Sequence, residues 1–192
     1  HFEGLRELYM AECRDVTNAA FVHLRGIHML DMVRWMMDLG WPISVSSNGG
    51  ILVDKASRAN ITDTQTATFD FGNLQVRWTH RTWGEGGDPK YPWSATFYGD
   101  KGTLDVGNWN APTYSAEGGP KRDGKIRGKQ NVPMIEHPDH FLDWLQCMRS
   151  GKTPNANIDA GYQHAVASLM AVISYDTGKK TTYDPVKRQI NT

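Results

Sequence analysis

The order of apolar and polar residues predicts one helix, then several strands, then two further helices. Apolar residues between positions 26 and 39 recur with a period near 3.6, which separates the side chains onto two faces of a helix. Gly40 ends this helix, and Pro42 prevents its continuation. One face carries Ile27, Leu30, Val33 and Met37, and the other carries His28, Asp31, Met32 and Trp35.

The middle of the chain predicts β-hairpins, because alternating or β-branched segments are separated by turn residues. The expected strands span residues 42–50, 64–71, 74–81, 93–99 and 103–106. Gly72-Asn73 forms a tight turn between the second and third of these strands. Residues 83–92 and 115–131 are rich in Gly, Pro and polar residues and are expected to be loops.

Both ends of the chain are expected to be helical. The segment GLRELYMAECRD at positions 4–15 has Leu5, Leu8, Tyr9 and Glu12 at helical spacing. Near the C-terminus, helices are expected from about 139 to 149, ended by Gly151, and from about 159 to 176, capped by Gly178. Their expected buried sides hold Phe141, Leu142, Leu145 and Met148 in the first helix, and Tyr162, Ala165, Val166, Leu169, Met170 and Ile173 in the second.

Elements grouped in this order favour an α+β fold, with an open-faced, predominantly antiparallel sheet and helices packed on one face. We divide the chain into an N-terminal segment, or remnant of a linker, at 1–23 and a single domain at 24–192. The uncovered face is expected to be apolar enough to bury against a second copy, giving a homodimer. The aromatic residues behind this expectation are Phe69, Phe71, Trp78, Trp93, Tyr98 and Trp109.

Composition and charge limit the partners and the compartment that we expect for this protein. The 192 residues include 21 basic and 21 acidic residues, so the formal net charge is zero and neither nucleic acid nor an anionic membrane is an expected partner. The 39% hydrophobic content is ordinary for a globular protein. Cys13 and Cys147 form no CxxC motif, and nothing demands an oxidising compartment, so a cytoplasmic location is expected, with the periplasm as the alternative.

The helix at 26–39 carries the first candidate chemistry. His28 and Asp31 are three residues apart and share a helix face, so Asp31 could orient His28 as a general acid or base. The same spacing fits a polar helix edge without a catalytic role.

Other polar motifs are weaker. His23 with His28 and Asp31 resembles a 2-His-1-carboxylate set, but the two histidines are five positions apart, which separates them around a helix. The HPDH motif at 137–140 fits helix capping better than zinc. No GxGxxG fingerprint, phosphate-binding loop or GxSxG motif occurs, so no cofactor or metal site is expected in this chain.

Taken together, the segments RGIHMLDMVRW, DTQTATFDF, FYGDKGTLDV and HFLDWLQCMRSGKTPNANIDAGYQHAVASLMAVISYDTGKKTTYDP resemble the C-terminal domain of the Gfo/Idh/MocA oxidoreductases over about residues 24–187. The resemblance implies a substrate and dimerisation domain that works beside a Rossmann domain binding NAD or NADP. It further implies that the substrate is a small-molecule sugar or polyol.

The resemblance also implies site residues. His28 falls on the histidine of the family's G-x-H-x-x-D segment, which exchanges a proton with the substrate hydroxyl, and Asp31 falls on its acidic position. Arg81 and Trp83 follow a strand near the substrate in family members and are expected to bind it. The chain departs from the pattern at Leu24, where many members have aspartate.

Three hypotheses follow. The first is that the chain is the substrate-binding and oligomerisation domain of an NAD(P)-dependent oxidoreductase, inactive alone because the residues before position 24 are too few for a Rossmann domain. The second is a non-catalytic dimeric domain that binds carbohydrate or has a structural role. The third is a metal-dependent sugar isomerase or lyase that uses His28 and Asp31.

Overall fold

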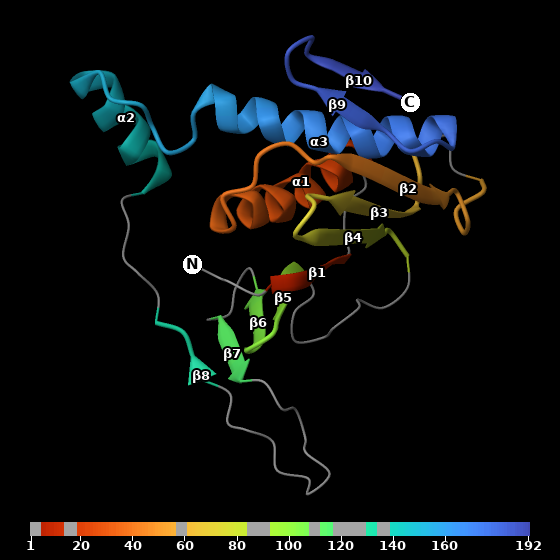
Figure 1. The fold of residues 1–192 in the computed structure, drawn as a ribbon, viewed down its shortest axis with the longest axis horizontal. Coiled ribbons are helices and arrows are strands. Elements are labelled where there is room, and N and C mark those ends of the chain that lie inside the picture. The colour runs from red at the N-terminus through yellow and green to blue at the C-terminus, as the bar shows by residue number, and fades with distance from the viewer. Residues whose placement is uncertain are drawn as a thin grey trace, which may run out of the picture.

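The computed structural model describes residues 5–13, 19–56, 61–83, 93–107, 112–116, 130–133 and 139–192 (Figure 1). Within these ranges, side chains are described from His28 onward, except those of residues 93, 130 and 131. The elements in chain order are β1 (Leu5–Cys13), α1 (Ala19–Met36), β2 (Ser44–Gly50), β3 (Thr64–Asp70), β4 (Gln75–Arg81), β5 (Trp93–Gly99), β6 (Gly102–Gly107), β7 (Thr113–Ala116), β8 (Gln130–Asn131), α2 (His140–Ser150), α3 (Ile158–Thr177), β9 (Thr182–Asp184) and β10 (Gln189–Asn191).

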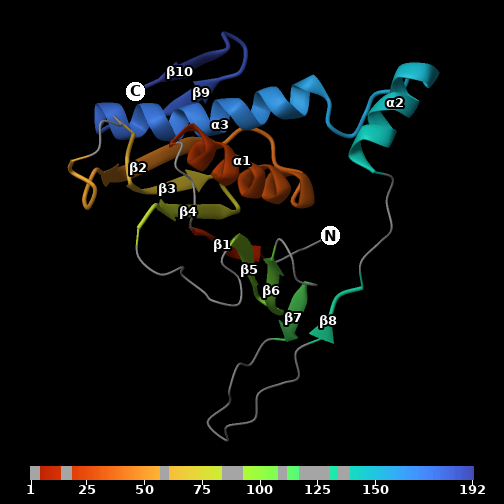
Figure 2. The same cartoon turned by 180° about the vertical axis from the view of Figure 1, so that it is seen from behind.

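A sheet of eight strands in the order β2-β3-β4-β1-β5-β6-β7-β8 forms the body of the protein. Its pairings are antiparallel except that of β1 with β4. In Figures 1 and 2, α3 runs along β2, and buried residues of α1 and α3 pack against those of β2, β3 and β4 in one core. The expected open-faced α+β fold is confirmed, as are the hairpins β3–β4 and β5–β6.

The prediction of a helix at positions 4–15 is wrong, because Leu5–Cys13 is strand β1. β1 lies in the middle of the sheet, parallel to β4 on one side and antiparallel to β5 on the other. Both partners come at least 60 residues later in the chain, so local helical spacing could not reveal them. The division into 1–23 and 24–192 stays a prediction, with β1 inside its first part.

One face of the sheet forms the core with α1 and α3. Strand positions alternate regularly between buried and less buried residues, as in β3 and β4. The fully buried residues at the centre are Val33 of α1, Met170 of α3, Val45 of β2, Val76 of β4 and Phe97 of β5. Burying each of these large side chains contributes about 1.5–3 kcal/mol.

The opposite face is more polar than expected. Phe69 and Trp78 both lie on the covered face, where they join the core. The alternate positions on the open face are largely Thr, Arg, Gln and Asp; Thr66 and Thr79 approach each other there, and Thr96 donates to Asp105. Tyr98 is exposed. The side chain of Trp93 and all of Trp109 lie outside the described residues.

The two C-terminal helices begin and end as predicted. Asp139 caps α2 and Asn157 caps α3, while Gly151 and Gly178 end them with φ near +68° and +66°, a left-handed conformation that glycine adopts without strain. None of the helices in the described part of the chain has both the length and the apolar character that a bilayer crossing requires.

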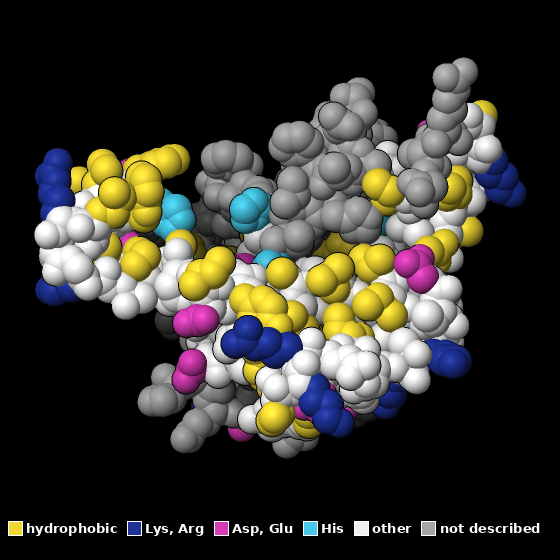
Figure 3. Space-filling model, turned by 90° about the horizontal axis from the view of Figure 1, so that it is seen from above, with side chains coloured by type: hydrophobic (Ala, Val, Ile, Leu, Met, Phe, Trp, Pro, Cys, Tyr) yellow, Lys and Arg dark blue, Asp and Glu magenta, His cyan; other side chains and the backbone are white. Residues whose placement is uncertain are grey.

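The buried sides of these helices differ from the prediction. In α3 the buried residues are His164, Val166, Ala167, Met170, Ala171 and Ser174, whereas Tyr162, Ala165 and Leu169 are exposed. In α2 no residue is buried, and Phe141 is 73% exposed. Figure 3 shows apolar side chains of α2 gathered at one end of the molecule. The spacing identified an apolar stripe on α2 correctly, but no described residue covers it.

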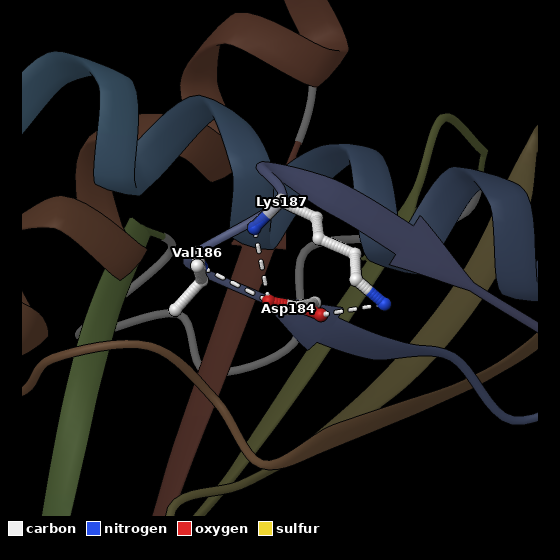
Figure 4. A network of polar contacts seen from close by, with 3 residues as sticks. All are labelled: Asp184, Val186 and Lys187. Carbon is white, nitrogen blue, oxygen red and sulfur yellow. Dashed lines mark hydrogen bonds and ion pairs between the residues drawn. The ribbon is translucent and has the colours of Figure 1, made fainter.

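The two strands β9 and β10 form a short antiparallel hairpin after α3. The sequence did not predict these strands. The turn of this hairpin is held by Asp184, whose Oδ1 accepts hydrogen bonds of 3.0 Å from the backbone N–H groups of Val186 and Lys187, while Oδ2 lies 3.8 Å from Lys187 Nζ (Figure 4). The hydroxyls of Tyr183 and Tyr162 are 2.8 Å apart, which ties this hairpin to α3.

A buried carboxylate holds the connection between β2 and β3. Asp63 accepts backbone hydrogen bonds from Leu52 at 2.9 Å, Val53 at 2.8 Å and Asp54 at 2.9 Å, and another from the Thr64 hydroxyl at 2.9 Å. Burial by itself would raise the pKa of Asp63, but these donors lower it to about 2.

We predict that Asp63→Asn lowers the free energy of unfolding by about 2–4 kcal/mol, because one acceptor oxygen becomes an amide NH2 facing N–H donors. The carboxylate is charged above pH 3.8 in both states, so its contribution is complete there and is lost as the pH falls from 3.8 toward 2. Thermal and acid unfolding of the variant measure both effects. Asp54→Asn, on the exposed neighbour, is the control; equal stability of the two variants would contradict the prediction.

Candidate functional site

His28 and Asp31 lie on the outward edge of α1. Both side chains are exposed, and they are separated by about one helical turn. Leu30 and Val33 occupy the opposite side and pack into the core. The core packing therefore fixes the rotation of α1 and points His28 and Asp31 toward a surface that a ligand can reach.

Arg34 lies in the seam between α1 and α3. Its Nη2 donates 2.7 Å to Oε1 of Gln163 on α3, and it also reaches the carbonyl oxygens of Leu39 at 3.1 Å and Gly40 at 3.2 Å. Burial lowers the pKa of Arg34, and the carboxylate of Asp31 acts in the opposite direction. Arg34 thus joins the end of α1 to α3 directly beside the candidate site.

His164 lies in the same seam, on α3. Its side chain is 6% exposed, and neither ring nitrogen has a hydrogen-bond partner within the described part of the chain. Burial lowers the pKa of His164 to about 4; Asp31 acts to raise it, and Arg34 and His28 act to lower it. The imidazole is therefore uncharged at neutral pH and lies within electrostatic reach of the His28–Asp31 pair.

Arg81 and Trp83 form a second group at the end of β4. The Cζ atom of Arg81 lies 5.6 Å from the centroid of the Trp83 ring, and the indole N–H of Trp83 donates 2.7 Å to Thr64 Oγ1. Arg81 follows His80, which is buried on the face covered by the helices, so Arg81 points to the open face. The structure brings together His28 with Asp31 and Arg81 with Trp83, but places the two pairs on opposite sides of the sheet.

The remaining sequence candidates do not form a site. The side chains of His23 and Leu24, and all of His137, lie outside the described residues. His140 is exposed at the start of α2, next to the capping residue Asp139. Within the described ranges, no cluster of three or more His, Cys, Asp or Glu side chains could hold a metal ion.

The residues present do not fit a nicotinamide dinucleotide. A dinucleotide fold needs parallel strands and a glycine-rich turn from a strand into a helix. The described strands form a single parallel pair, β1 with β4, and the connection from β1 to α1 has the sequence RDVTN, without glycine. We therefore assign neither binding of a nicotinamide cofactor nor hydride transfer to the residues of this chain.

The sequence matches a known family. The model of the C-terminal α/β domain of the Gfo/Idh/MocA oxidoreductases matches residues 17–183, which is most of the chain. This chain belongs to the Gfo/Idh/MocA oxidoreductase family. The resemblance predicted from the motifs is confirmed, and the open-faced sheet described above is the fold of this family's C-terminal domain.

Solved structures show the same fold of the Gfo/Idh/MocA domain. UDP-N-acetylglucosamine 3-dehydrogenase from Acidithiobacillus ferrooxidans is 15% identical with a TM-score of 0.68, over 92% of this chain and 55% of that one. Aldose-aldose oxidoreductase from Caulobacter crescentus, in complex with glycerol, is 11% identical with a TM-score of 0.70, over 94% and 56%.

A third match is an oxidoreductase from Agrobacterium radiobacter in complex with NAD+, L-tartaric acid and magnesium, 14% identical with a TM-score of 0.66, over 94% of this chain and 57% of that one. The Gfo/Idh/MocA domain thus spans little more than half the length of these proteins. No curated protein matches the chain.

Sequence reasoning did not single out Arg34, Gln163 or His164, which the structure places together in the seam between α1 and α3. A signal was present, because His164 precedes Ala167 and Ala171 by three and seven residues, the spacing of one helix face. Histidine is fully buried less often than apolar residues, so a histidine in line with these alanines is a signal of a special role. The apolar face that the periodicity predicts for α3 does not include His164.

We predict that His164→Leu is at least as stable as the wild type at neutral pH, because leucine removes two unpaired polar atoms of a buried ring. In the wild type, His164 has a pKa of 6.5 in the unfolded chain and of about 4 in the folded chain. The unfolded chain therefore binds the proton first as the pH falls, and the free energy of unfolding decreases as the pH falls from 6.5 to about 4. The full difference is at most about 3 kcal/mol. Thermal unfolding against pH should show this loss in the wild type and not in the variant; equal slopes would contradict it.

Proposed function

We propose that this chain is the substrate-binding and oligomerisation domain of an NAD(P)-dependent oxidoreductase that acts on a sugar or polyol, and that it is not active alone. The observation that carries the proposal is the exposed His28–Asp31 pair on α1, in a chain of the Gfo/Idh/MocA family. Two structural relatives are oxidoreductases of a nucleotide sugar and of aldoses by their names.

His28 has the role of proton acceptor and donor in this proposal. Oxidation of a hydroxyl group releases a proton, and an imidazole at the surface of α1 can take it and return it in the reverse direction. Asp31, one turn away on the same edge, has the role of orienting the imidazole. Arg81 and Trp83 would bind substrate only from the other side of the sheet, so their proposed role is separate from the His28 site.

We predict that His28→Asn in the full-length oxidoreductase lowers kcat by about 100-fold or more, because asparagine cannot exchange a proton at neutral pH. KM for the sugar or polyol should change much less. Asp31→Asn should lower kcat by a smaller factor. Steady-state kinetics with the substrate that the wild type oxidises measures these changes.

The control is Lys180→Gln, which changes an exposed residue outside both the seam and α2 and should leave both constants unchanged. A His28→Asn variant with wild-type kcat would contradict the assigned role.

The nicotinamide cofactor, in this proposal, is bound by a domain outside these 192 residues. The relatives are nearly twice as long as the matched region, and one of them is in complex with NAD+. The apolar side chains of α2 are the surface on which we place that domain: Phe141, Leu142, Trp144, Leu145 and Met148. An apolar patch of this kind is typical of a surface that is covered in the complete protein.

We predict that Leu142→Gln combined with Leu145→Gln lowers the free energy of unfolding of the full-length protein by about 2–4 kcal/mol, because both leucines would be buried against the cofactor domain. Val186→Gln replaces an apolar residue that is 91% exposed and should change stability by no more than about 0.5 kcal/mol. If the double variant behaves like Val186→Gln, α2 does not carry the domain contact.

The oligomer we propose is a homodimer through the open face of the sheet. That face is rich in Thr and Arg, so a second copy would be held largely by polar contacts rather than by the aromatic contacts first expected. We place the protein in the cytoplasm, in keeping with the free thiol of Cys147.

A second candidate function is a non-catalytic dimeric domain that binds carbohydrate or has a structural role. Leu24, at a position where many family members have aspartate, favours this alternative. Calorimetric binding of a neutral sugar without turnover in the presence of either nicotinamide cofactor would support it over the oxidoreductase.

A further inference from the structure

The seam between α1 and α3 holds buried polar atoms without partners. Both ring nitrogens of His164 and the Nε of Arg34 are buried and have no hydrogen bond among the described residues. Buried polar groups in folded proteins are nearly always hydrogen-bonded, because an unpaired donor or acceptor has lost its water without compensation. Such atoms therefore mark a place where a bound molecule can supply the bond.

A purely structural role explains His164 poorly. The neighbouring positions on the buried side of α3 are mostly small or apolar, namely Val166, Ala167, Met170 and Ala171. A leucine at position 164 would fill a similar volume without burying polar atoms. Retaining an imidazole there lowers stability, and residues that lower stability are concentrated at functional sites.

The surroundings of His164 connect it to the proposed site. Gln163, the residue before His164 on α3, accepts a 2.7 Å hydrogen bond from Arg34 of α1, one turn beyond Asp31. Asp31, Arg34 and His28 also act on the His164 ring electrostatically. The charge of Asp31 offsets that of Arg34, so the cluster favours an uncharged ligand. An uncharged imidazole presents one donor and one acceptor, and an alcohol hydroxyl group offers one of each in return.

We propose that His164 is a third polar residue of the His28–Asp31 site, and that its uncharged imidazole hydrogen-bonds a hydroxyl group of the substrate. The inference rests on the proposed function, and it deepens that function by assigning a binding residue on a second helix. His28 exchanges the proton, whereas His164 holds a hydroxyl group and stays uncharged throughout.

The test uses the full-length protein and three probes, myo-inositol, D-glucose and glycerol. Affinity is measured for the wild type, His164→Leu and His164→Gln. Histidine-selective 15N NMR follows the ring nitrogens during the titration, because their shifts report hydrogen bonding at each atom. Lys180→Gln is the control for a substitution at an exposed residue outside the seam and outside α2.

We expect the wild type to bind at least one probe, and His164→Leu to bind it about tenfold more weakly or worse. Glutamine, which keeps a donor and an acceptor, should restore part of the affinity, and the His164 ring signals should shift on binding. A space-filling histidine would not produce the rescue or the shift. If His164→Leu does not fold, His164→Gln and the NMR titration decide alone.

Two results would overturn the inference, and they are distinguishable. Binding to the wild type with unchanged affinity in both His164 variants, or with unmoved His164 signals, removes His164 from the site and leaves the proposed function intact. Failure of the wild type to bind any of the three probes removes the proposed function, and the inference with it.

Discussion

The apolar layer between the sheet and the helices α1 and α3 is the interaction on which the rest of this domain depends. Val33 and Met170 reach it from the helices, and Val76 and Phe97 from the strands, all without exposed surface. Because both helices must turn their apolar sides to the sheet, their rotation is fixed. The polar edge of α1 then faces outward, and the side of α3 toward α1 becomes a seam.

That seam differs chemically from the layer beneath it. Arg34 bonds Gln163 across it, while His164 lies buried beside them with unpaired nitrogens. The helices α1 and α3 therefore meet through polar groups at their edges and through apolar groups below. Apolar residues at the buried positions of this seam would stabilise the domain at least as well as the polar ones. The polar seam is what distinguishes the His28 edge from an ordinary amphipathic helix surface.

The predictions that succeeded depended on local signals. The caps Asp139 and Gly178, and the turn at Gly72, act within a few residues and can be read directly. β1 could not be found in this way, because its partners β4 and β5 are distant in sequence. The burial of His164 and the exposure of Phe141 depend on which surfaces the completed fold covers. Periodicity predicts which residues share one face of a helix, but not which other element, if any, packs against that face.

The position of β1 has a consequence for how the chain folds. The hairpins β3–β4 and β5–β6 are local and can form early, but the first of these leaves the edge of β4 open and the second leaves the edge of β5 open. β1 joins these edges, so the two halves of the sheet become one only when the first strand of the chain inserts between them. Without β1, the edges of β4 and β5 are unpaired, and unpaired strand edges promote pairing with other chains. β1 thus acts as the closing element of the sheet, even though it precedes both hairpins in the sequence.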